Sequence, residues 1–334
     1  MTAQWNLVTG ATGLLGSHLV ERLVERGERV RALVRPASDV RELERWPVEL
    51  VRGDLSDARS LQGAVANVGV VYHCAARLGD WGPWPMFEAG TVQTTRNLVE
   101  VCLGRGVRRF LHVSSVAAYG RPRRPADGSL LDECAPLGQN FRWWDYYGRA
   151  KAAAEEEVRR LGPAATIVRP TWIYGPRDRV ILPRMVQALR QGRVVLIGSG
   201  DNRLNMVYAG DVAEGAVLAA NSPAAAGEVF HLASEGEITQ QQFFDSLADS
   251  LGLPRVKRRV PFRVADTFGL ACEMAGRATG RKRAPAVTRS GISLLSRATL
   301  FSSEKARRLL GWQPRMEIHE GLSKTLAWLA QQEA

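Results

Sequence analysis

A glycine-rich turn near the start of the chain constrains its fold more than any other feature. The turn, TGATGLLG at residues 9–16, directly follows a short apolar run at 5–8 and leads into an amphipathic segment at 14–26. A strand, a glycine turn and a helix in this order form the arrangement that binds the pyrophosphate of a dinucleotide. A flexible turn is the alternative, but the flanking strand and helix favour the dinucleotide cradle.

Each glycine of the turn has a separate expected role. Gly10 permits the tight turn, Gly13 lets the backbone approach the phosphates, and Gly16 lets the helix pack close to the strand. The helix N-terminus then presents unpaired N–H groups and a partial positive charge to an anion. We therefore expect the cofactor to contact the following residues of the turn: Gly10, Thr12, Gly13, Leu14, Leu15 and Gly16.

Apolar runs that are typical of buried parallel strands alternate with helical segments through the first half of the chain. The expected strands are 5–9, 29–34, 48–51, 69–73, 109–114 and 165–168, and the expected helices are 14–26, 57–66, 86–104 and 145–161. This alternation predicts an α/β fold, a Rossmann-type doubly wound parallel sheet with helices on both faces.

The pattern becomes less regular beyond residue 174. The expected helices are 180–191, 211–220, 239–251, 262–279, 303–309 and 319–331, and the expected strands are 194–197 and 228–232. We expect residues 1–175 to form the dinucleotide-binding domain. Residues 176–334 should form mainly a smaller, mostly helical C-terminal substrate lobe, with about 194–232 contributing to both parts. The substrate should then lie between them, at the carboxyl ends of the strands.

Composition narrows the class of protein. Hydrophobic residues make up 45% of the 334, no apolar run is long enough to span a bilayer, and we expect no secretory signal. The four cysteines lack the spacing of a metal or redox site, so we expect reduced thiols, no metal and a cytoplasmic location. The net charge of +11 comes with no nucleic-acid-binding motif. Three explanations of the positive charge remain: a solvated basic surface, an acidic substrate, or peripheral contact with an anionic membrane.

Tyr147 and Lys151 are four residues apart on an expected helix, so they share one face. A cation near a phenol favours the phenolate and lowers its pKa, which suits a group that exchanges a proton during hydride transfer at a carbonyl. Ser114 and Ser115 follow the fifth expected strand, where a hydroxyl can donate to a substrate oxygen. Ser115 is the first choice for that role and Ser114 the second.

These motifs, in this order and spacing, resemble the short-chain dehydrogenase/reductase superfamily. The chain length and the large C-terminal lobe resemble its extended branch, the NAD-dependent epimerase/dehydratase family. Further matching segments extend the resemblance over residues 4–330: GDL at 53–55, HCAA at 73–76, VSSVAAYG at 113–120, RPTWIYGPRD at 169–178, and SEKA with LGWQP within 303–314. The pattern is most similar to 3β-hydroxysteroid dehydrogenase-like and dihydroflavonol-reductase-like members.

The resemblance implies a role for individual residues. Tyr147 is the general acid or base, Lys151 binds the nicotinamide ribose and tunes Tyr147, and Ser115 polarises the reacting oxygen. The other implied cofactor contacts are Asp54 and Leu55 at the adenine, Ala75 and Ala76 along the adenosine, Ser114, and Pro170 and Ile173 beside the nicotinamide.

The end of the second expected strand favours NADP over NAD. NAD-preferring sites usually carry an acid there to bind the ribose 2′-hydroxyl, but Val34 occupies that position, Arg35 follows it and Arg41 is near. A guanidinium suits a 2′-phosphate through paired charge-assisted hydrogen bonds. The alternative is that Arg35 stacks on the adenine, which would allow NAD as well.

Two substrate classes compete within the extended branch. Nucleotide-sugar enzymes often carry an asparagine soon after the arginine of the sixth strand and an arginine near position 204. This chain has Pro170-Thr171 and Leu204 there, with Arg203 one step away. Apolar surface on the expected substrate side comes instead from four tryptophans: Trp81, Trp84, Trp143 and Trp144. We expect a bulky apolar hydroxy or keto substrate. The alternatives are a nucleotide-sugar epimerase or dehydratase, and a non-catalytic NADP-binding regulator.

Three further features bear on the site and its surroundings. Thr91 stands where the family often has an asparagine that supports a proton relay, and Thr94 stands where it often has glycine. The expected helix at 262–279 lies near two basic clusters, so it either caps the cleft or rests on a membrane, and we favour the cap. Pairing of the expected helices 86–104 and 145–161 across a two-fold axis would give a homodimer.

Overall fold

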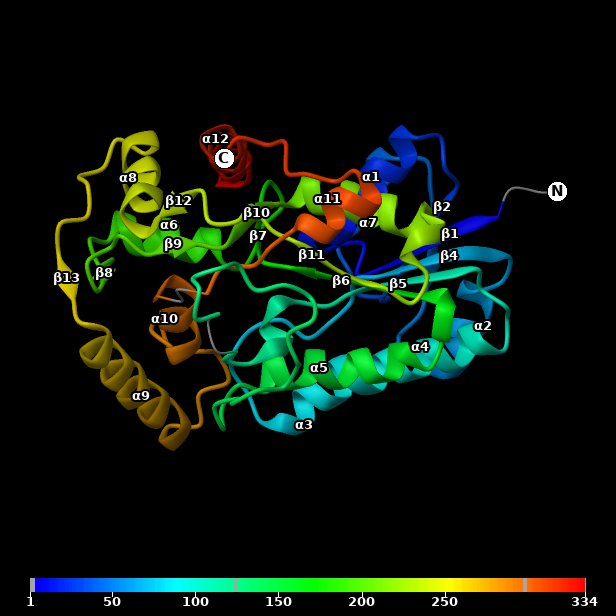
Figure 1. The fold of residues 1–334 in the computed structure, drawn as a ribbon, viewed down its shortest axis with the longest axis horizontal. Coiled ribbons are helices and arrows are strands. Elements are labelled where there is room, and N and C mark those ends of the chain that lie inside the picture. The colour runs from blue at the N-terminus through cyan, green and yellow to red at the C-terminus, as the bar shows by residue number, and fades with distance from the viewer. Residues whose placement is uncertain (1–3, 123–124, 297–298, 334) are drawn as a thin grey trace.

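A seven-stranded parallel sheet forms the centre of the computed structural model, which describes residues 4–122, 125–296 and 299–333 (Figure 1). The strand order is β3–β2–β1–β4–β5–β6–β11. These strands are β1 (Trp5–Thr9), β2 (Val30–Val34), β3 (Val48–Arg52), β4 (Val68–His73), β5 (Arg109–Val113), β6 (Ala165–Pro170) and β11 (Val229–Leu232). The predicted Rossmann-type sheet is confirmed, with the expected strand at 228–232 as its seventh member.

Helices cover both faces of this sheet (Figure 1). One face carries α1 (Leu14–Glu25), α7 (Ala209–Asn221) and α11 (Glu304–Leu310), and the other carries α2 (Ala58–Ala64), α4 (Thr94–Leu103) and α5 (Tyr146–Arg159). Alternate side chains of each strand enter opposite cores: Val8 and Leu111 pack toward α1 and α7, whereas Leu7 and Phe110 pack toward α4 and α5. Because both faces are buried, the strands have nearly continuous apolar sequences.

The helix expected at 86–104 contains a widened turn. It consists of α3 (Trp84–Phe87), a π-helical turn η2 (Glu88–Gln93) and α4. The Thr91 carbonyl accepts hydrogen bonds from the hydroxyls of Thr94 and Thr95, at 3.1 and 2.6 Å. Side-chain hydroxyls therefore satisfy a carbonyl at the point where the regular backbone pattern is interrupted.

The second lobe is assembled at the carboxyl ends of the strands. Its helices are α6 (Leu182–Arg190), α8 (Gln240–Ser250), α9 (Phe262–Ala278), α10 (Arg289–Ser296) and α12 (Ile318–Glu333). The lobe also contains three short pairs of β-strands. They are β7 (Trp172–Tyr174) with β10 (Met206–Tyr208), β8 (Leu196–Ile197) with β13 (Arg259–Val260), and β9 (Arg203–Leu204) with β12 (Ile238–Thr239). Helix α10 and most of these strands were not predicted, because two- and three-residue strands carry no periodicity.

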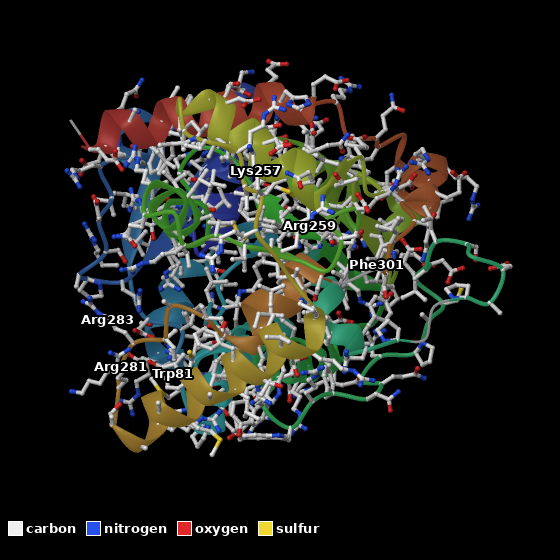
Figure 2. The ribbon with its side chains drawn as sticks, turned by 90° about the vertical axis from the view of Figure 1, so that its left-hand side faces the viewer. Trp81, Lys257, Arg259, Arg281, Arg283 and Phe301 are labelled. Atoms are coloured by element: carbon white, nitrogen blue, oxygen red, sulfur yellow. The ribbon has the colours of Figure 1, made fainter. Side chains whose placement is uncertain are left out.

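Helix α9 lies on the outside of this lobe, and Trp81 lies near its carboxyl end in Figure 2. The Trp81 ring lies close to Gly276, where an added Cβ would come within 3.1 Å of it. None of the helices in the described ranges is both long and apolar enough to cross a membrane.

Candidate active site

The glycine turn has the geometry of a phosphate cradle. Gly10 has a φ of +66°, and a Cβ there would lie 2.8 Å from the Ala75 nitrogen. A Cβ on Gly16 would lie 2.1 Å from the Gly10 carbonyl oxygen, so only glycine lets α1 start this close to β1. Gly13 is exposed and caps α1 without any side-chain hydrogen bond, which leaves the first N–H groups of the helix free for an anion. The described residues therefore fit a dinucleotide pyrophosphate.

The catalytic candidates converge where α5 passes the end of β5. The Ser115 hydroxyl lies close enough to the Tyr147 phenol to act on its pKa. The Ser115 oxygen accepts a hydrogen bond from the Ala117 N–H at 3.1 Å, which leaves the serine proton free to donate. Lys151 is buried, with 3% of its surface exposed, and its Nζ donates to the Val113 carbonyl at 2.8 Å.

Close packing of α5 brings Tyr147 to Ser115. A Cβ on Gly148 would lie 2.6 Å from the Ala117 carbonyl oxygen, so glycine is required for this approach. The Asp145 carboxylate caps the helix by accepting from the Gly148 N–H at 3.0 Å. Sequence reasoning missed Gly148, although a glycine directly after the candidate tyrosine was the available signal.

Burial governs the protonation of the two α5 residues. It raises the pKa of Tyr147 to about 12, with the nearby Ser115 hydroxyl acting in the opposite direction. It also lowers the pKa of Lys151 to about 8. The expected lowering of the Tyr147 pKa by Lys151 is therefore wrong for the protein alone, because desolvation of the phenol dominates and the ammonium is directed at a backbone carbonyl.

Ser114 points away from Ser115, into a buried polar network. Its hydroxyl donates to the Glu155 carboxylate at 2.6 Å. Glu155 binds the Arg169 guanidinium through two hydrogen bonds of 2.8 and 2.6 Å, and Arg169 also donates to the Tyr119 hydroxyl at 2.6 Å. The hydroxyl of Tyr119 in turn contacts His231. This arrangement favours Ser115 over Ser114 as the residue that meets the substrate. No local sequence pattern predicts this network.

A second buried group lies beneath Lys151. His73 is hydrogen-bonded on both ring nitrogens, to Thr9 at 2.8 Å and to Thr95 at 3.0 Å. His112 lies beside it on β5, with ring centroids 5.4 Å apart, and neither of its nitrogens has a partner among the described residues. Burial lowers the pKa of both histidines, that of His73 to about 3, so both rings are neutral beside the lysine.

Arg35 and Asp54, the two charged residues predicted to contact the adenosine part of the cofactor, interact electrostatically. Arg35 is exposed directly after β2, and its charge contributes to lowering the pKa of Asp54, after the hydrogen bonds from Ser56. Asp54 accepts from the Ser56 N–H and hydroxyl at 2.8 and 2.7 Å. Arg41 binds Asp39 through paired hydrogen bonds of 3.0 and 2.8 Å. Arg35 is therefore the better placed of the two arginines for a 2′-phosphate.

The remaining predicted cofactor residues lie along the same edge. Leu15 is buried under the turn, whereas Thr12 and Leu14 are half-buried. Ala75 and Ala76 are half-buried after β4, and the Ala75 N–H lies 3.4 Å from the Thr9 hydroxyl. Pro170 ends β6, Ile173 lies on β7, and Leu55 packs against the core under α2 and α4.

A small hollow, with room for about one water molecule, lies beside Tyr147. It is lined by Asp80, Phe87, Trp144, Asp145, Tyr146, Tyr147 and Ser290. Trp84 packs beside Tyr146, with ring centroids 6.1 Å apart. The Asp80 carboxylate accepts a hydrogen bond from the Thr288 hydroxyl, which ties this wall to the loop before α10.

Helix α9 is joined to the same wall. Its buried Glu273 binds Arg289 through hydrogen bonds of 3.0 and 2.7 Å, and the Arg289 guanidinium lies 4.7 Å from the Trp144 ring. Arg277 lies over both Trp81 and Trp143. One face of α9 therefore packs over the tryptophans, as expected of a cap.

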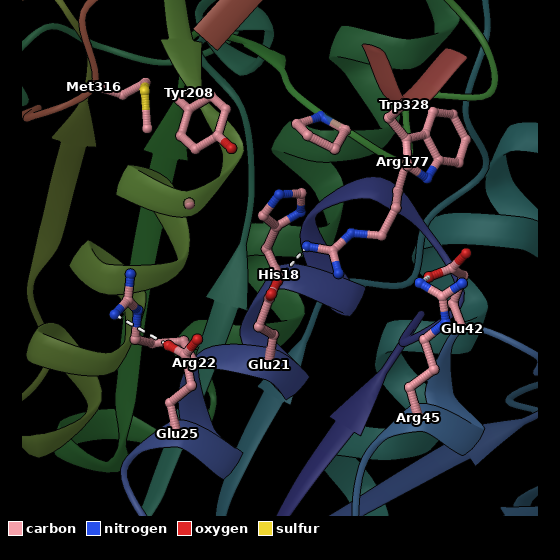
Figure 3. A pocket seen from close by; sticks show the side chains of 12 residues that line it. His18, Glu21, Arg22, Glu25, Glu42, Arg45, Arg177, Tyr208, Met316 and Trp328 are labelled. Atoms are coloured by element: carbon pink, nitrogen blue, oxygen red, sulfur yellow. Dashed lines mark hydrogen bonds and ion pairs between the residues drawn. The ribbon is translucent and has the colours of Figure 1, made fainter. Parts of the chain in front are cut away.

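A larger charged hollow lies elsewhere, between α1, the segment after β7 and α12. Figure 3 shows His18, Glu21 and Arg177 in its middle, with Trp328 at one side. Arg177 is paired with Glu21. None of the three catalytic candidates lines this hollow, so we do not assign it to the reaction.

A Rossmann-type sheet with a glycine cradle and a Ser–Tyr–Lys group at the carboxyl ends of its strands defines an extended short-chain dehydrogenase/reductase. The chain matches the NAD dependent epimerase/dehydratase family over residues 6–233 and belongs to it. The predicted family is confirmed.

Curated relatives match over nearly the whole chain. A 2-alkyl-3-oxoalkanoate reductase of Stenotrophomonas maltophilia (strain K279a) is 33% identical, covering 96% of this chain and 98% of the relative. A 3beta-hydroxysteroid-dehydrogenase/decarboxylase isoform 2 of Arabidopsis thaliana is 30% identical, covering 97% and 62% respectively. The crystal structure of gox2253 matches with a TM-score of 0.81 and 34% identity, covering 98% of both chains.

Proposed function

We propose that this chain transfers hydride between NADP(H) and the hydroxy or keto group of a bulky apolar substrate. One observation carries the proposal: the hydroxyls of Tyr147 and Ser115 lie close together at the end of β5, next to the aromatic side chains of Phe87, Trp144 and Tyr146. Two hydroxyls can bind one substrate oxygen while aromatic rings hold the apolar skeleton next to them.

Hydride transfer to a carbonyl gives Ser115 and Tyr147 one task each. NADPH, when bound, supplies the hydride. Ser115 donates its proton to the carbonyl oxygen and polarises it, while the Ala117 N–H that the Ser115 oxygen accepts holds the hydroxyl in place. Tyr147 gives its proton to the oxygen as negative charge develops there. The raised pKa of Tyr147 keeps the phenol protonated and suits it to act as an acid in the reducing direction.

The relatives guide the choice of substrate. One of them is named for a keto acid with an alkyl branch and another for a hydroxysteroid. We propose the same class for this chain, with long-chain 2-alkyl-3-oxoalkanoates as the first substrates to test. The preference for NADPH rests on Arg35.

A substrate screen that follows NADPH fluorescence tests the proposal. The panel contains 2-alkyl-3-oxoalkanoates, 3-ketosteroids and hydroxysteroids, flavanonols, and UDP- and dTDP-sugars, with NADP supplied for the alcohols. We expect turnover with an apolar member, and turnover at least about 100-fold slower with the Tyr147→Phe variant. Conversion of nucleotide sugars alone would overturn the substrate class; it is followed by chromatography of the sugars, because an epimerase or dehydratase returns the hydride and leaves no net change in the cofactor. Cofactor binding without turnover on any panel member would favour a regulator.

A nucleotide-sugar enzyme is the second candidate, since the same family includes epimerases and dehydratases. Its diphosphate would need a free cation near β9. Arg203 donates to the Gly236 carbonyl at 3.1 Å, and Leu204 is buried in the core of the second lobe. Arg203 must therefore give up this contact before it can bind a diphosphate, which favours the apolar class.

A further inference from the structure

Helix α9 carries a second apolar face, opposite the one that packs over the tryptophans. The buried side consists of Ala265, Gly269, Glu273 and Gly276. Val264, Phe268, Ala271 and Ala275 recur at helical spacing on the other side, and all four are exposed. Val264 and Phe268 leave 56% and 58% of their surface in solvent, and Met274 at the edge of this face leaves 63%. We call Val264, Phe268, Ala271, Met274 and Ala275 the outer face of α9.

Basic residues lie at both ends of this outer face. Figure 2 shows Arg259 on the segment that leads into the amino end of α9 and Lys257 farther from the helix on the same segment, whereas Arg281 and Arg283 lie near its carboxyl end. Residues 251–283 contain nine lysines and arginines but only two acids, Asp266 and Glu273. Both acids are already paired, Asp266 with Arg142 and Glu273 with Arg289. The surface around the outer face is therefore positively charged.

Most of these cations lack a carboxylate partner. Arg255 is paired with Asp249. Among the residues that the structure describes, no ion pair is formed by the exposed side chains of Lys257, Arg258, Arg259, Arg263, Arg281, Lys282 and Arg283. Exposed, unpaired cations around an apolar stripe suit a flat surface that is apolar in its interior and anionic at its boundary.

We propose that the outer face of α9 docks onto an anionic phospholipid bilayer, with Val264 and Phe268 entering the acyl boundary and the two basic clusters contacting the headgroups. The helix lies in the membrane plane and does not cross it. The proposal does not depend on the substrate class, because vesicle binding is measured without turnover.

Charge favours a bilayer over a second copy of the chain. A two-fold contact through the outer face, with the two α9 helices antiparallel, would place the basic cluster at one end against the basic cluster at the other end of the partner's helix. Such like-charge contacts oppose association, whereas anionic lipid neutralises both clusters at once.

Sedimentation with large vesicles tests the proposal, using the full chain without substrate. We expect binding to phosphatidylcholine vesicles containing 30% phosphatidylglycerol, weak binding to pure phosphatidylcholine, and loss of binding as salt is raised. A Val264→Ser/Phe268→Ser variant should lose most of the binding. A Lys257→Gln/Arg258→Gln/Arg259→Gln variant should bind about 100-fold more weakly, at roughly fivefold for each cation removed.

A matched control variant makes the same kinds of substitution, of one exposed apolar and one exposed basic residue, at a site away from α9. Leu103 is 49% exposed at the end of α4, and Arg108 is exposed just before β5, at the amino ends of the strands and so away from the second lobe. A Leu103→Ser/Arg108→Gln variant should bind like the unmutated chain. The proposal is overturned if the unmutated chain does not bind anionic vesicles, if the control loses as much binding as the α9 variants, or if Phe268→Ser converts a stable dimer to monomer without affecting vesicle binding.

Discussion

The Glu155 carboxylate holds the Arg169 guanidinium by two parallel hydrogen bonds, 2.8 Å from Nε and 2.6 Å from Nη2, in the interior between α5 and β6. Both side chains are essentially inaccessible to solvent. Glu155 lies one helical turn beyond Lys151, so the pair anchors the segment of α5 that carries the catalytic candidates.

Glu155→Gln should destabilise the protein strongly. The substitution removes one charge and leaves the Arg169 charge buried, which typically costs about 3–5 kcal/mol. Urea unfolding without cofactor measures the free energy of unfolding. Glu320→Gln is the matched control, because Glu320 pairs with Lys324 at the surface and its loss should change little. Equal effects of the two substitutions would contradict this account of the buried pair.

Local motifs made the fold and the centre of the site predictable. The glycine turn, Ser115, and the Tyr147–Lys151 spacing each lie within a few consecutive residues, so their chemistry is visible in the sequence. The buried network was not predictable, because the topology brings Ser114, Glu155, Arg169 and His231 together from four separate elements. The direction of the Tyr147 pKa was missed for a related reason: the dehydration of a phenol depends on packing that spacing does not encode.

Tyr147→Phe should separate catalysis from cofactor binding. The substitution removes the proton donor and keeps the ring, so kcat should fall by about 10²–10⁴-fold. The dissociation constant for NADPH, measured by fluorescence, should change much less. Tyr146→Phe is the matched control on the neighbouring position, since its ring packs against Trp84 and Phe87. A Tyr147→Phe variant with unchanged turnover would refute the catalytic assignment.

Lys151→Met should stabilise the cofactor-free protein at pH 7 while abolishing turnover. Burial lowers the pKa of Lys151 from 10.5 to about 8. The buried charge therefore costs about 3 kcal/mol wherever both the folded and unfolded chains are protonated, that is, below pH 8. Between pH 8 and 10.5 the folded chain loses the proton first, so the penalty fades as pH rises.

Unfolding in urea at pH 7, 8.5 and 10 tests whether the free-energy penalty of the buried Lys151 charge decreases as pH rises. The advantage of Lys151→Met over the unmutated chain should be largest at pH 7 and smallest at pH 10. Lys324→Met, at an exposed position, should show no such trend. A Lys151→Met variant that is equally destabilised at all three pH values would show that its hydrogen bond to Val113 outweighs the desolvation of the ammonium.

Arg35→Ala should weaken NADPH binding and leave NADH binding nearly unchanged. Arg35 is exposed beside Asp54, and a 2′-phosphate there would receive charge-assisted hydrogen bonds worth about 10–100-fold in affinity. Arg41→Ala is the control, because Arg41 is already bound to Asp39. A preference of the unmutated chain for NADH would show that Arg35 does not select the cofactor.

Gly16→Ala and Gly63→Ala should have opposite effects on stability. A Cβ at residue 16 would lie 2.1 Å from the Gly10 carbonyl oxygen, so α1 must move away from the turn, at a cost of about 1–3 kcal/mol. Nothing lies within 4 Å of a Cβ at residue 63, in α2, where alanine should stabilise the helix by about 0.5–1 kcal/mol. Because the N–H groups of the turn move with α1, Gly16→Ala should also weaken NADPH binding by more than tenfold. Normal NADPH affinity in this variant would mean that the phosphate cradle does not depend on the close approach of α1 to β1.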